Sequence, residues 1–391
     1  MTPVLSSTSR AAGKRVAVVG GGIIGLGIAW EAIQRGHQVT VFDPAPASGA
    51  TYAAAGMLAP VSELHYQEEH LLALTVESAR RYPALMSRLE AGGRTTGYQR
   101  TQTIAVGADA ADRQVLADLK QAQVRQGLTV EDMTTRQARA EEPMLGPGLS
   151  AAFRIPGDRQ VDPRLLSRVL IDDVRAGGML EAQSVESLAY DDGNRTRVAG
   201  VVLVDGTHVE ADETVIANGL QSPEIKDLPA TLSLPVRPVY GDVLRLRVPR
   251  HLQPLLTATV RGVIRGRSVY LVPRQDGSVV VGATQREGGT TGVSAGGVYE
   301  LLRDAQTIVP AVAELEFEEA TCRARPGTPD NAPLLGRPRG VEGLICATGF
   351  FRHGVLLMPV TASICNDLID GGPADPAYRA FLPDRFQGET A

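Results

Sequence analysis

Six residues near the start of the chain have the type and spacing of a loop that binds phosphate. Residues 20–25 read GGGIIG and directly follow the β-branched run 15–19. In such a G-x-G-x-x-G loop, Gly20 permits a tight turn, Gly22 lets the backbone approach a pyrophosphate, and Gly25 lets the next helix pack closely. The N–H groups and the dipole of that helix favour an anion at its N-terminus. The segment therefore predicts dinucleotide binding.

An acidic residue, Asp43, ends the next β-rich run, 38–42. It lies 18 residues beyond Gly25, where a carboxylate can accept hydrogen bonds from a ribose diol and disfavours a 2′-phosphate. The alternative is a glycine-rich turn that binds nothing, but the order of strand, loop, helix and acid favours a dinucleotide. The loop does not decide between NAD and FAD. Residues 48–60 are almost all small and could lie flat against a large ring system, although small-residue packing explains them equally well.

The loop must be positioned by a strand–helix–strand unit, and the rest of the chain supplies further elements. Apolar residues recur at helical spacing after residue 25, and Gly36 ends that helix. We expect further helices over 71–89, 110–126, 134–142 and 355–369. We expect strands over 184–190, 198–204, 209–216, 234–246 and 344–347, and β structure over 261–283 with a hairpin turn at Asp276-Gly277. The pattern predicts an α/β protein with a Rossmann-like parallel sheet and a second, β-rich unit.

Length and composition indicate an ordinary globular protein of two domains. The chain has 391 residues, of which 43% are hydrophobic and 21% charged, and its formal net charge is −5. No basic stretch alternates with aromatic residues, so we expect no nucleic-acid partner. The longest apolar stretch near the C-terminus, 355–365, contains Pro359 and is shorter than the roughly 20 residues that span a bilayer. We expect no membrane segment.

The cysteines and the first residues bear on the cellular compartment. Cys322, Cys346 and Cys365 are an odd number and too widely spaced for a zinc site or a disulfide framework. We therefore expect no metal and a reducing, cytoplasmic location. The first dozen residues lack the apolar core of a secretory signal and are interpreted as a loose tail.

In combination, seven blocks in chain order resemble the glycine oxidase (ThiO) branch of the D-amino acid oxidase and sarcosine oxidase superfamily of FAD enzymes. They are 20–25, 53–60 with Glu63 after it, 161–164, 270–274, 281–283, 325–330 and 349–357. The resemblance implies a Rossmann-like FAD-binding domain interleaved with a substrate domain on an antiparallel sheet. The implied bounds are 14–90, 145–225 and 320–375 for the FAD-binding domain, 91–144 and 226–319 for the substrate domain, and 1–13 and 376–391 for tails.

The resemblance also implies the residues that bind the substrate. Arg325 matches the carboxylate-binding arginine, Arg352 the arginine of the final loop, and Tyr270 a tyrosine of the substrate pocket. These types make chemical sense, because a guanidinium grips a carboxylate with two parallel hydrogen bonds and a phenol adds a third donor. The alternative for any single arginine is an exposed salt bridge, worth at most about 1 kcal/mol.

The loop and the resemblance together imply the contacts to FAD. Val185 would supply a backbone contact to the adenine, and Met57 would lie against the flavin edge. The loop before the final helix would face the flavin pyrimidine, where the helix dipole stabilises negative charge. The full set is Gly20, Gly22, Ile23, Ile24, Gly25, Asp43, Ala54, Ala55, Gly56, Met57, Val185, Gly219, Gly349, Arg352, His353, Gly354, Val355 and Leu356.

The resemblance implies oxidative deamination of glycine, another small amine or a D-amino acid. Hydride transfer to the flavin needs no side-chain base, oxygen takes the electrons, and ammonia and hydrogen peroxide leave. The imine product would serve assembly of the thiamine thiazole. The FAD is expected to be non-covalent, because Cys322 lies one residue out of the register of relatives that attach flavin covalently. We also expect a homo-oligomer.

Three departures from the family pattern leave substrate preference open: Tyr240 and Asp242 around a glycine, and Asn218 before Gly219. One alternative is a related oxidase or dehydrogenase acting on sarcosine, another D-amino acid or a 2-hydroxy acid, with a quinone as electron acceptor. Another is a flavin-binding subunit without turnover.

Overall fold

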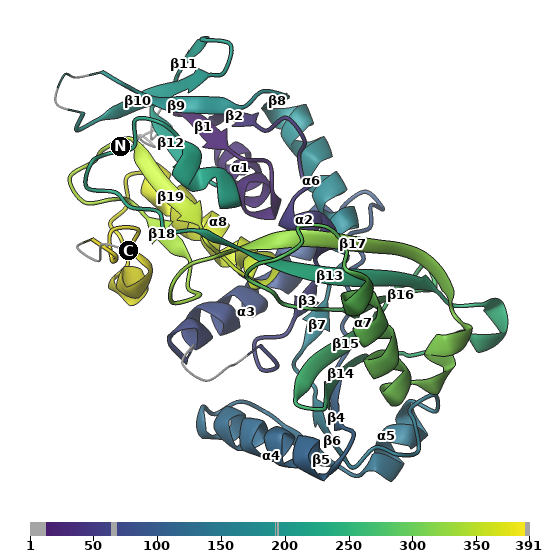
Figure 1. Ribbon diagram of the computed structural model, residues 1–391. Coiled ribbons are helices and arrows are strands. Elements are labelled where there is room, and N and C mark those ends of the chain that lie inside the picture. The colour runs from purple at the N-terminus through teal and green to yellow at the C-terminus, as the bar shows by residue number, and fades with distance from the viewer. Residues whose placement is uncertain (1–12, 64–68, 192, 194, 388–391) are drawn as a thin grey trace, which may run out of the picture.

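The computed structural model describes residues 13–63, 69–191, 193 and 195–387. Within these residues the chain forms two large sheets (Figure 1). One has six strands in the order β18-β19-β12-β1-β2-β8, and the other has eight strands in the order β17-β13-β16-β15-β14-β4-β6-β5. This arrangement confirms the predicted α/β fold with a Rossmann-like parallel sheet and a second, antiparallel sheet.

The six-stranded sheet is parallel except for its edge strand β18. Its helices contribute to one apolar core, in which α1 and α8 supply many of the fully buried side chains. The strands are β1 (Arg15–Val19), β2 (Gln38–Phe42), β8 (Met179–Glu181), β12 (Glu213–Ile216), β18 (Leu334–Gly336) and β19 (Leu344–Thr348). The helices are α1 (Ile23–Arg35), α3 (Leu72–Leu89), α6 (Pro163–Gly177) and α8 (Gly354–Ile369), with the short α2 (Ala50–Ala53).

The eight-stranded sheet is antiparallel except for the β14–β4 pair. Its longest strands, β13 and β17, pair along their whole length and run across the middle of the molecule in Figure 1. The strands are β4 (Thr103–Gly107), β5 (Glu131–Met133), β6 (Ala151–Ile155), β13 (Arg237–Arg247), β14 (Thr259–Ile264), β15 (Arg267–Pro273), β16 (Ser278–Gly282) and β17 (Glu316–Gly327). Its helices are α4 (Ala110–Arg125), α5 (Thr135–Glu141) and α7 (Ala295–Ile308).

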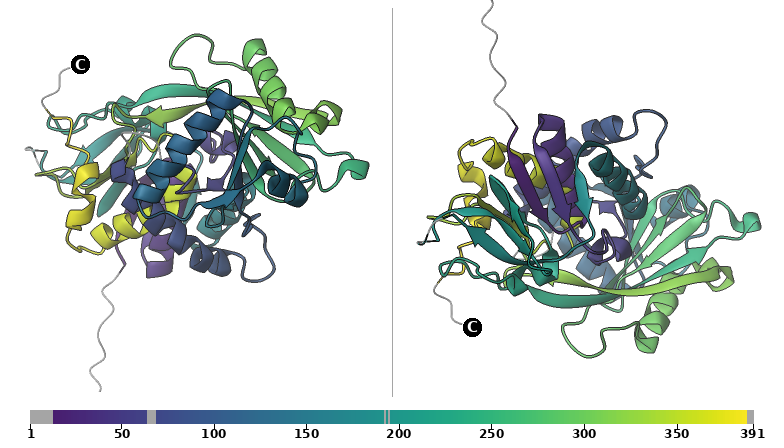
Figure 2. Two further views of the ribbon diagram at one scale, coloured as in Figure 1. Left: turned by 90° about the horizontal axis from the view of Figure 1, so that it is seen from below. Right: turned by 90° about the horizontal axis from the view of Figure 1, so that it is seen from above.

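Smaller elements complete the described part of the fold. A three-stranded sheet contains β9 (Val185–Tyr190), β10 (Val198–Leu203) and β11 (His208–Glu210), and a two-stranded ribbon pairs β3 (Met57–Leu58) with β7 (Arg159–Gln160). Short 3-10 turns are η1 (Glu69–Leu71), η2 (Gly219–Glu224), η3 (Arg250–Leu252), η4 (Pro310–Glu314) and η5 (Pro376–Phe381). In the right-hand view of Figure 2, the green strands of the eight-stranded sheet lie to one side of the purple β1–α1 unit.

Two predicted β runs are divided differently in the structure. The run 209–216 is two strands, β11 and β12, which belong to different sheets. The run 261–283 contains a second hairpin turn at Arg265-Gly266, where both residues have positive φ, besides the predicted turn at Asp276-Gly277. The domain bounds given above stay a prediction. The segment 145–225, predicted for the FAD-binding domain, contains β6, and the predicted boundary at residue 320 falls within β17. Both strands belong to the antiparallel sheet.

Both predicted tails extend beyond the described residues, but part of the C-terminal one is packed. Phe381 in η5 is buried, and Arg385 makes hydrogen bonds of 2.9 Å to both carboxylate oxygens of Asp330. The stretch 376–387 is therefore docked onto the six-stranded sheet near β18. Residues 1–12 and 388–391 lie outside the described residues.

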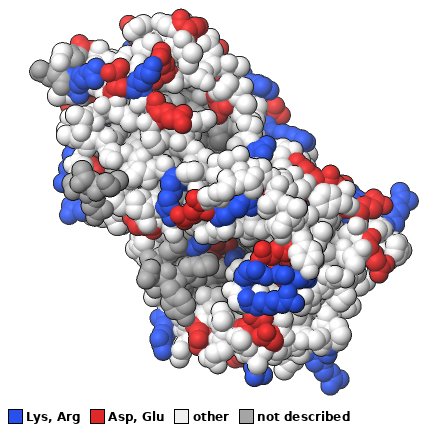
Figure 3. Space-filling view, viewed as in Figure 1, with Lys and Arg blue, Asp and Glu red and all other residues white. Residues whose placement is uncertain are grey.

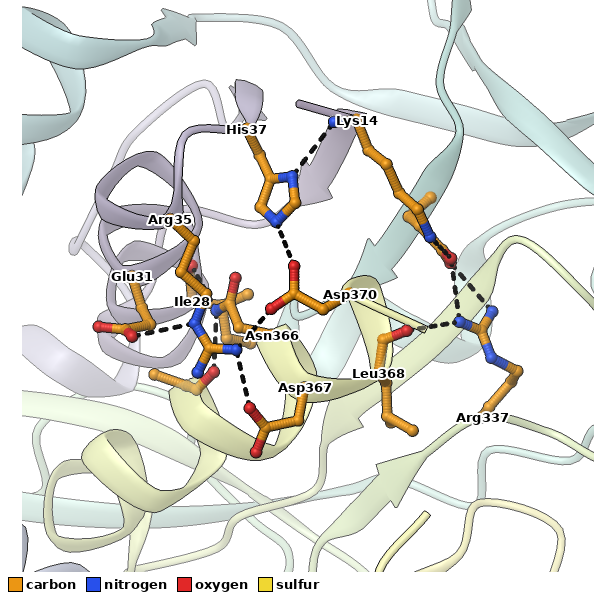
Figure 4. A network of polar contacts seen from close by, with 12 residues as sticks. Lys14, Ile28, Glu31, Arg35, His37, Arg337, Asn366, Asp367, Leu368 and Asp370 are labelled. Atoms are coloured by element: carbon orange, nitrogen blue, oxygen red, sulfur yellow. Dashed lines mark hydrogen bonds and ion pairs between the residues drawn. The ribbon is translucent and has the colours of Figure 1, made fainter. Parts of the chain in front are cut away.

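Polar contacts fix the ends of α1 and α8 against each other (Figure 4). Arg35 Nη1 lies 2.7 Å from a carboxylate oxygen of Asp367 and 2.7 Å from one of Asp370. The Asn366 amide donates to the carbonyl of Ile28 at 3.1 Å. These contacts fix α1 and α8 relative to each other. The N-termini of both helices line one cavity.

Charged side chains of both signs are interspersed over the face shown in Figure 3. Among the described residues, the structure contains no helix that is both long and apolar enough to cross a membrane.

Candidate active site

A cavity of about 1110 Å³ lies between the two sheets. It extends from the glycine loop, Asp43 and Val185 to Tyr270 and Arg325 on the antiparallel sheet. Every residue predicted above to bind FAD or substrate lines this cavity except Gly25. The volume exceeds the roughly 300–1,000 Å³ of common small-molecule sites. The cavity therefore has room for a dinucleotide together with a small substrate.

The glycine loop has the geometry that its spacing predicts. Gly20 has a positive φ of 106°, and a Cβ atom there would lie 2.6 Å from the Ala217 carbonyl oxygen. A Cβ atom on Gly25 would collide with the Gly20 carbonyl, so Gly25 serves the packing of α1 onto the loop. A Cβ atom on Gly22 would meet only the Thr51 hydroxyl, at 3.7 Å. Gly22 therefore leaves free the space in the cavity that a pyrophosphate needs.

The N-terminus of α1 is open to an anion. Its N-cap is Gly22, which has no side chain to occupy the free N–H groups, and its first turn has no acidic residue. The Ile23 N–H donates to Thr51 Oγ1 at 3.1 Å, which adds a hydroxyl to the phosphate cradle. Asp43 accepts hydrogen bonds from the N–H groups of Gly21 at 2.6 Å and Ala45 at 2.8 Å. Each of its oxygens keeps a further lone pair for a ribose hydroxyl.

The N-terminus of α8 faces the same cavity. His353 is its N-cap and is buried, and Gly354, Val355 and Leu356 line the cavity. The first turn of α8 has no acidic residue. The preceding loop is held by the N–H of Phe351, which donates to the Pro326 carbonyl at 2.8 Å. A positive helix end in this position favours negative charge on a bound ring.

Arg325 lies on β17 with its guanidinium against the backbone of Gly241 on β13. A Cβ atom on Gly241 would lie 2.6 Å from Arg325 Nη2 and 2.7 Å from its Cζ, so only glycine leaves room for the guanidinium. Its Nη1 donates to the Thr284 carbonyl at 3.4 Å. Burial lowers the pKa of Arg325, and the nearby charge of Arg352 acts in the same direction. The sequence motif predicted Arg325 but not the role of Gly241, because their proximity depends on the β13–β17 pairing.

Tyr270 lies on β15 beside a second such glycine. A Cβ atom on Gly282 of β16 would lie 2.5 Å from Tyr270 Cζ. Burial raises the pKa of the Tyr270 phenol, although the charge of Arg325 opposes this rise. The phenol is therefore protonated at neutral pH and available as a donor within the cavity. The structure thus brings the predicted pair Arg325 and Tyr270 into one site.

Glu63 and Arg261 also line the cavity, and neither was assigned a role from the sequence. Arg261 Nη1 donates to Glu63 Oε1, and Arg352 Nε lies 3.3 Å from Glu63 Oε2. The Glu63 side chain is only 10% exposed. Burial opposes the charge on Arg261, but the Glu63 carboxylate outweighs it and raises the pKa of that guanidinium. Glu63 therefore bridges two cations in the cavity wall.

A second carboxyl lies behind this pair. Asp158 is buried and accepts a hydrogen bond from the Ser62 hydroxyl. Burial raises the pKa of Asp158 to about 6, although hydrogen bonds from Ser62 and Thr103 and the charge of Arg261 oppose that rise. At neutral pH Asp158 is therefore mostly ionised and adds a negative charge beside Arg261.

The three departures from the family pattern have structural explanations. Asp242 is fully buried and accepts hydrogen bonds from Arg286, at 3.0 Å to Oδ1, and from Ser294, at 2.9 Å to Oδ2. Burial by itself would raise the pKa of Asp242, but these hydrogen bonds hold it below the ordinary value. Tyr240 pairs through its backbone with Arg286 at 2.8 Å and 3.0 Å. Asp242 and Tyr240 thereby fix the segment 284–294, whose first residue contacts Arg325.

Asn218 supports the opposite end of the cavity. Its Oδ1 lies 2.9 Å from the Ser222 hydroxyl, which also contacts Thr348 Oγ1 at 2.8 Å. Thr348 Oγ1 in turn donates to the Gly219 carbonyl at 3.0 Å. These contacts hold the turn at Gly219, which lines the cavity beside the glycine loop.

The donors present fit a flavin dinucleotide. Two helix N-termini, a glycine that leaves space for a pyrophosphate, a fixed carboxylate and the small residues 53–56 all face one cavity. Arg274 fixes the small-residue segment, because its buried guanidinium donates to the carbonyls of Ala55 and, at 2.9 Å, Val161. Among the described residues, no cluster of His, Cys, Asp or Glu has the arrangement of a metal site.

Fold and cavity together define a dinucleotide-binding protein. The family model described as FAD dependent oxidoreductase matches residues 15–368, and the chain belongs to this family. It is therefore an FAD-dependent enzyme, as the sequence motifs predict.

Individual relatives extend the comparison. The chain is 33% identical to a protein named glycine oxidase from Geobacillus kaustophilus, over 91% of this chain and 92% of that protein. The crystal structure of glycine oxidase from the same organism superposes with a TM-score of 0.85, at 32% identity, over 95% of this chain and 99% of that one. A protein named bifunctional protein ThiO/ThiG from Trichormus variabilis is 32% identical over 96% of this chain. This chain spans only 56% of that bifunctional relative.

Proposed function

We propose that the protein oxidises glycine and other small amino acids with FAD. The observation that carries the proposal is the position of Arg325 and Tyr270 in the same cavity as the dinucleotide cradle. A guanidinium and a phenol provide three donors for one carboxylate. The similarity to proteins named glycine oxidase supports glycine as the first substrate to test.

The side chains of the protein orient the substrate. Arg325 holds the carboxylate, the Tyr270 hydroxyl adds a donor, and Gly241 keeps the guanidinium in place. FAD, when bound, supplies the acceptor for the hydride of the substrate Cα–H bond. The N-terminus of α8, which lines the cavity, would stabilise negative charge on a ring system bound there. No side-chain base is needed, because orientation and electrostatics lower the barrier.

The products follow from this chemistry. The substrate becomes an imine, which water hydrolyses to a keto acid and ammonia, and oxygen takes up the electrons as hydrogen peroxide. We include in the proposal that the glycine imine serves thiazole assembly for thiamine. This part of the proposal is supported by the relatives named bifunctional protein ThiO/ThiG, in which the segment similar to this chain is about half of a longer protein. A longer bifunctional protein fits a product that is used in a second reaction.

The proposal includes non-covalent FAD. Cys322 is buried beside Asp242 and is not among the residues that line the cavity. Burial and the neighbouring Asp242 raise the pKa of its thiol, so the thiolate that a covalent link requires is disfavoured. Acid precipitation should release the yellow colour into the supernatant, and colour retained in the pellet would contradict this part of the proposal. A cytoplasmic location and a homo-oligomer stay predictions; sedimentation of the purified protein checks the latter.

The test is oxygen consumption with glycine, sarcosine, D-alanine and D-proline, measured together with ammonia and peroxide. We expect equal amounts of oxygen consumed and peroxide formed, with one ammonia for each glycine. Flavin reduction without oxygen uptake would identify a dehydrogenase instead.

A further inference from the structure

The Glu63 carboxylate occupies an unusual position for an acidic group in a site that must attract a carboxylate. It lines the cavity between Arg261 and Arg352, and each of its oxygens contacts one guanidinium. Arg261 and Arg352 approach it from β14 and from the loop before α8, which are far apart in the sequence. The bridge is thus made across the cavity wall by two separate parts of the fold.

Among the described residues, charges of both signs surround this region. Arg261, Arg325 and Arg352 carry three positive charges, while Glu63 and the ionised Asp158 carry two negative charges. Tyr270 is neutral, since burial raises the pKa of its phenol.

We propose that Glu63 determines specificity by filling, from within the protein, the place between Arg261 and Arg352 that a second anionic group of a substrate would take. The inference rests on the proposed function and defines its substrate class as amino acids with one carboxylate. A substrate with two carboxylates would bring its second anion against Glu63. Both guanidiniums of that place are already engaged, so the second anion meets repulsion without a partner.

The proposal predicts that removing the charge of Glu63 opens a second anion subsite. In Glu63→Gln, Arg261 and Arg352 keep their charges but lose the ion pair with the Glu63 carboxylate. A second substrate carboxylate can then accept charge-assisted hydrogen bonds from them. The change should favour dianions over monoanions by roughly tenfold to hundredfold, the range expected for one charge-assisted hydrogen bond.

The experiment uses two non-oxidisable ligands that share one ether backbone, methoxyacetate and oxydiacetate. Both are ethers without an amine, and they differ by one carboxylate. Their dissociation constants are measured by calorimetry on the flavin-loaded wild type and on Glu63→Gln. We expect the wild type to bind methoxyacetate more tightly, and the variant to shift the ratio of the two constants at least tenfold toward oxydiacetate.

A matched control is available in Glu213. This buried carboxylate also bridges two cations, Lys14 Nζ at 3.2 Å and Arg337 Nη1 at 2.9 Å, but it does not line the cavity. Glu213→Gln should leave the ratio of the two constants unchanged. The double variant Glu63→Gln/Arg261→Gln should lose the gain for oxydiacetate, because one of the two guanidiniums is absent.

An unchanged ratio in flavin-loaded Glu63→Gln would overturn the proposal. If that variant does not retain flavin, the two dissociation constants of the flavin-loaded wild type test the proposal. A wild type that binds oxydiacetate as tightly as methoxyacetate would also overturn it. Anaerobic flavin reduction by glycine is followed on the same wild-type sample. A shifted ratio without reduction by glycine would refute the proposed function and leave the role of Glu63 intact.

Discussion

Gly241→Ala tests whether the position of the Arg325 guanidinium controls substrate affinity. The added Cβ atom would lie 2.6 Å from Nη2 and 2.7 Å from Cζ, about 1 Å closer than ordinary van der Waals contact. The guanidinium is the mobile end of a flexible side chain, whereas β13 is paired on both sides. The arginine should therefore move and the strand should stay.

The displacement should cost one of the two charge-assisted hydrogen bonds to the substrate carboxylate, about 1.5–3 kcal/mol. That is a rise of roughly 10-fold to 150-fold in the dissociation constant for glycine. Fold stability should change little, because alanine is favoured over glycine in a strand by about 0.5–1 kcal/mol and offsets part of the strain. The assay is anaerobic flavin reduction at increasing glycine, with thermal unfolding and flavin content measured on the same sample.

Gly296→Ala is the matched control, since a Cβ atom on Gly296 in α7 meets no atom within 4 Å. It should leave the glycine affinity unchanged. A wild-type affinity for glycine in folded, flavin-loaded Gly241→Ala would refute the assignment of Arg325 as the carboxylate anchor.

Further changes test other parts of the site. Arg325→Ala should retain FAD but slow anaerobic reduction by glycine severely, and Arg325→Lys should fall between it and the wild type, because lysine restores charge without the two-pronged geometry; equal rates in all three would contradict the anchor. Gly22→Val should fold yet lack flavin, because its side chain would enter space that the protein leaves open; full flavin occupancy in the folded variant would disprove the phosphate cradle. The pKa of Asp158 in the folded protein is about 6, against an ordinary value of 3.8. Ionisation of Asp158 therefore lowers the free energy of unfolding by about 3 kcal/mol. This loss of stability is absent below about pH 4 and complete above about pH 6 to 7. In urea titrations, Asp158→Asn should therefore gain stability relative to the wild type as the pH rises from 4 to 7, and a constant difference would exclude the raised pKa.

The parts of the site that depend on local sequence could be predicted. The glycine loop, the helix after it and Asp43 are fixed by neighbouring residues, since a turn, a helix N-terminus and a strand end need only short-range contacts. Arg325 and Tyr270 were predicted because the motifs around them resemble those of a family.

The remaining parts depend on pairing between distant segments. Glu63 and Arg261 are 198 residues apart, and Gly241 meets Arg325 only through the register of β13 and β17. No periodicity in the sequence reports such contacts, because loop closure and strand register are decided by the packing of the whole domain. The division of 209–216 between two sheets has the same origin: it follows from the partners of β11 and β12 and not from their own residues.

The central claim is that glycine binds beside the flavin and reduces it. Anaerobic mixing of the flavin-loaded protein with glycine, followed by the flavin absorbance, measures this step without the reaction with oxygen. We predict complete bleaching at a rate that saturates with glycine concentration. A flavin that stays oxidised with glycine, sarcosine, D-alanine and D-proline alike would contradict the claim.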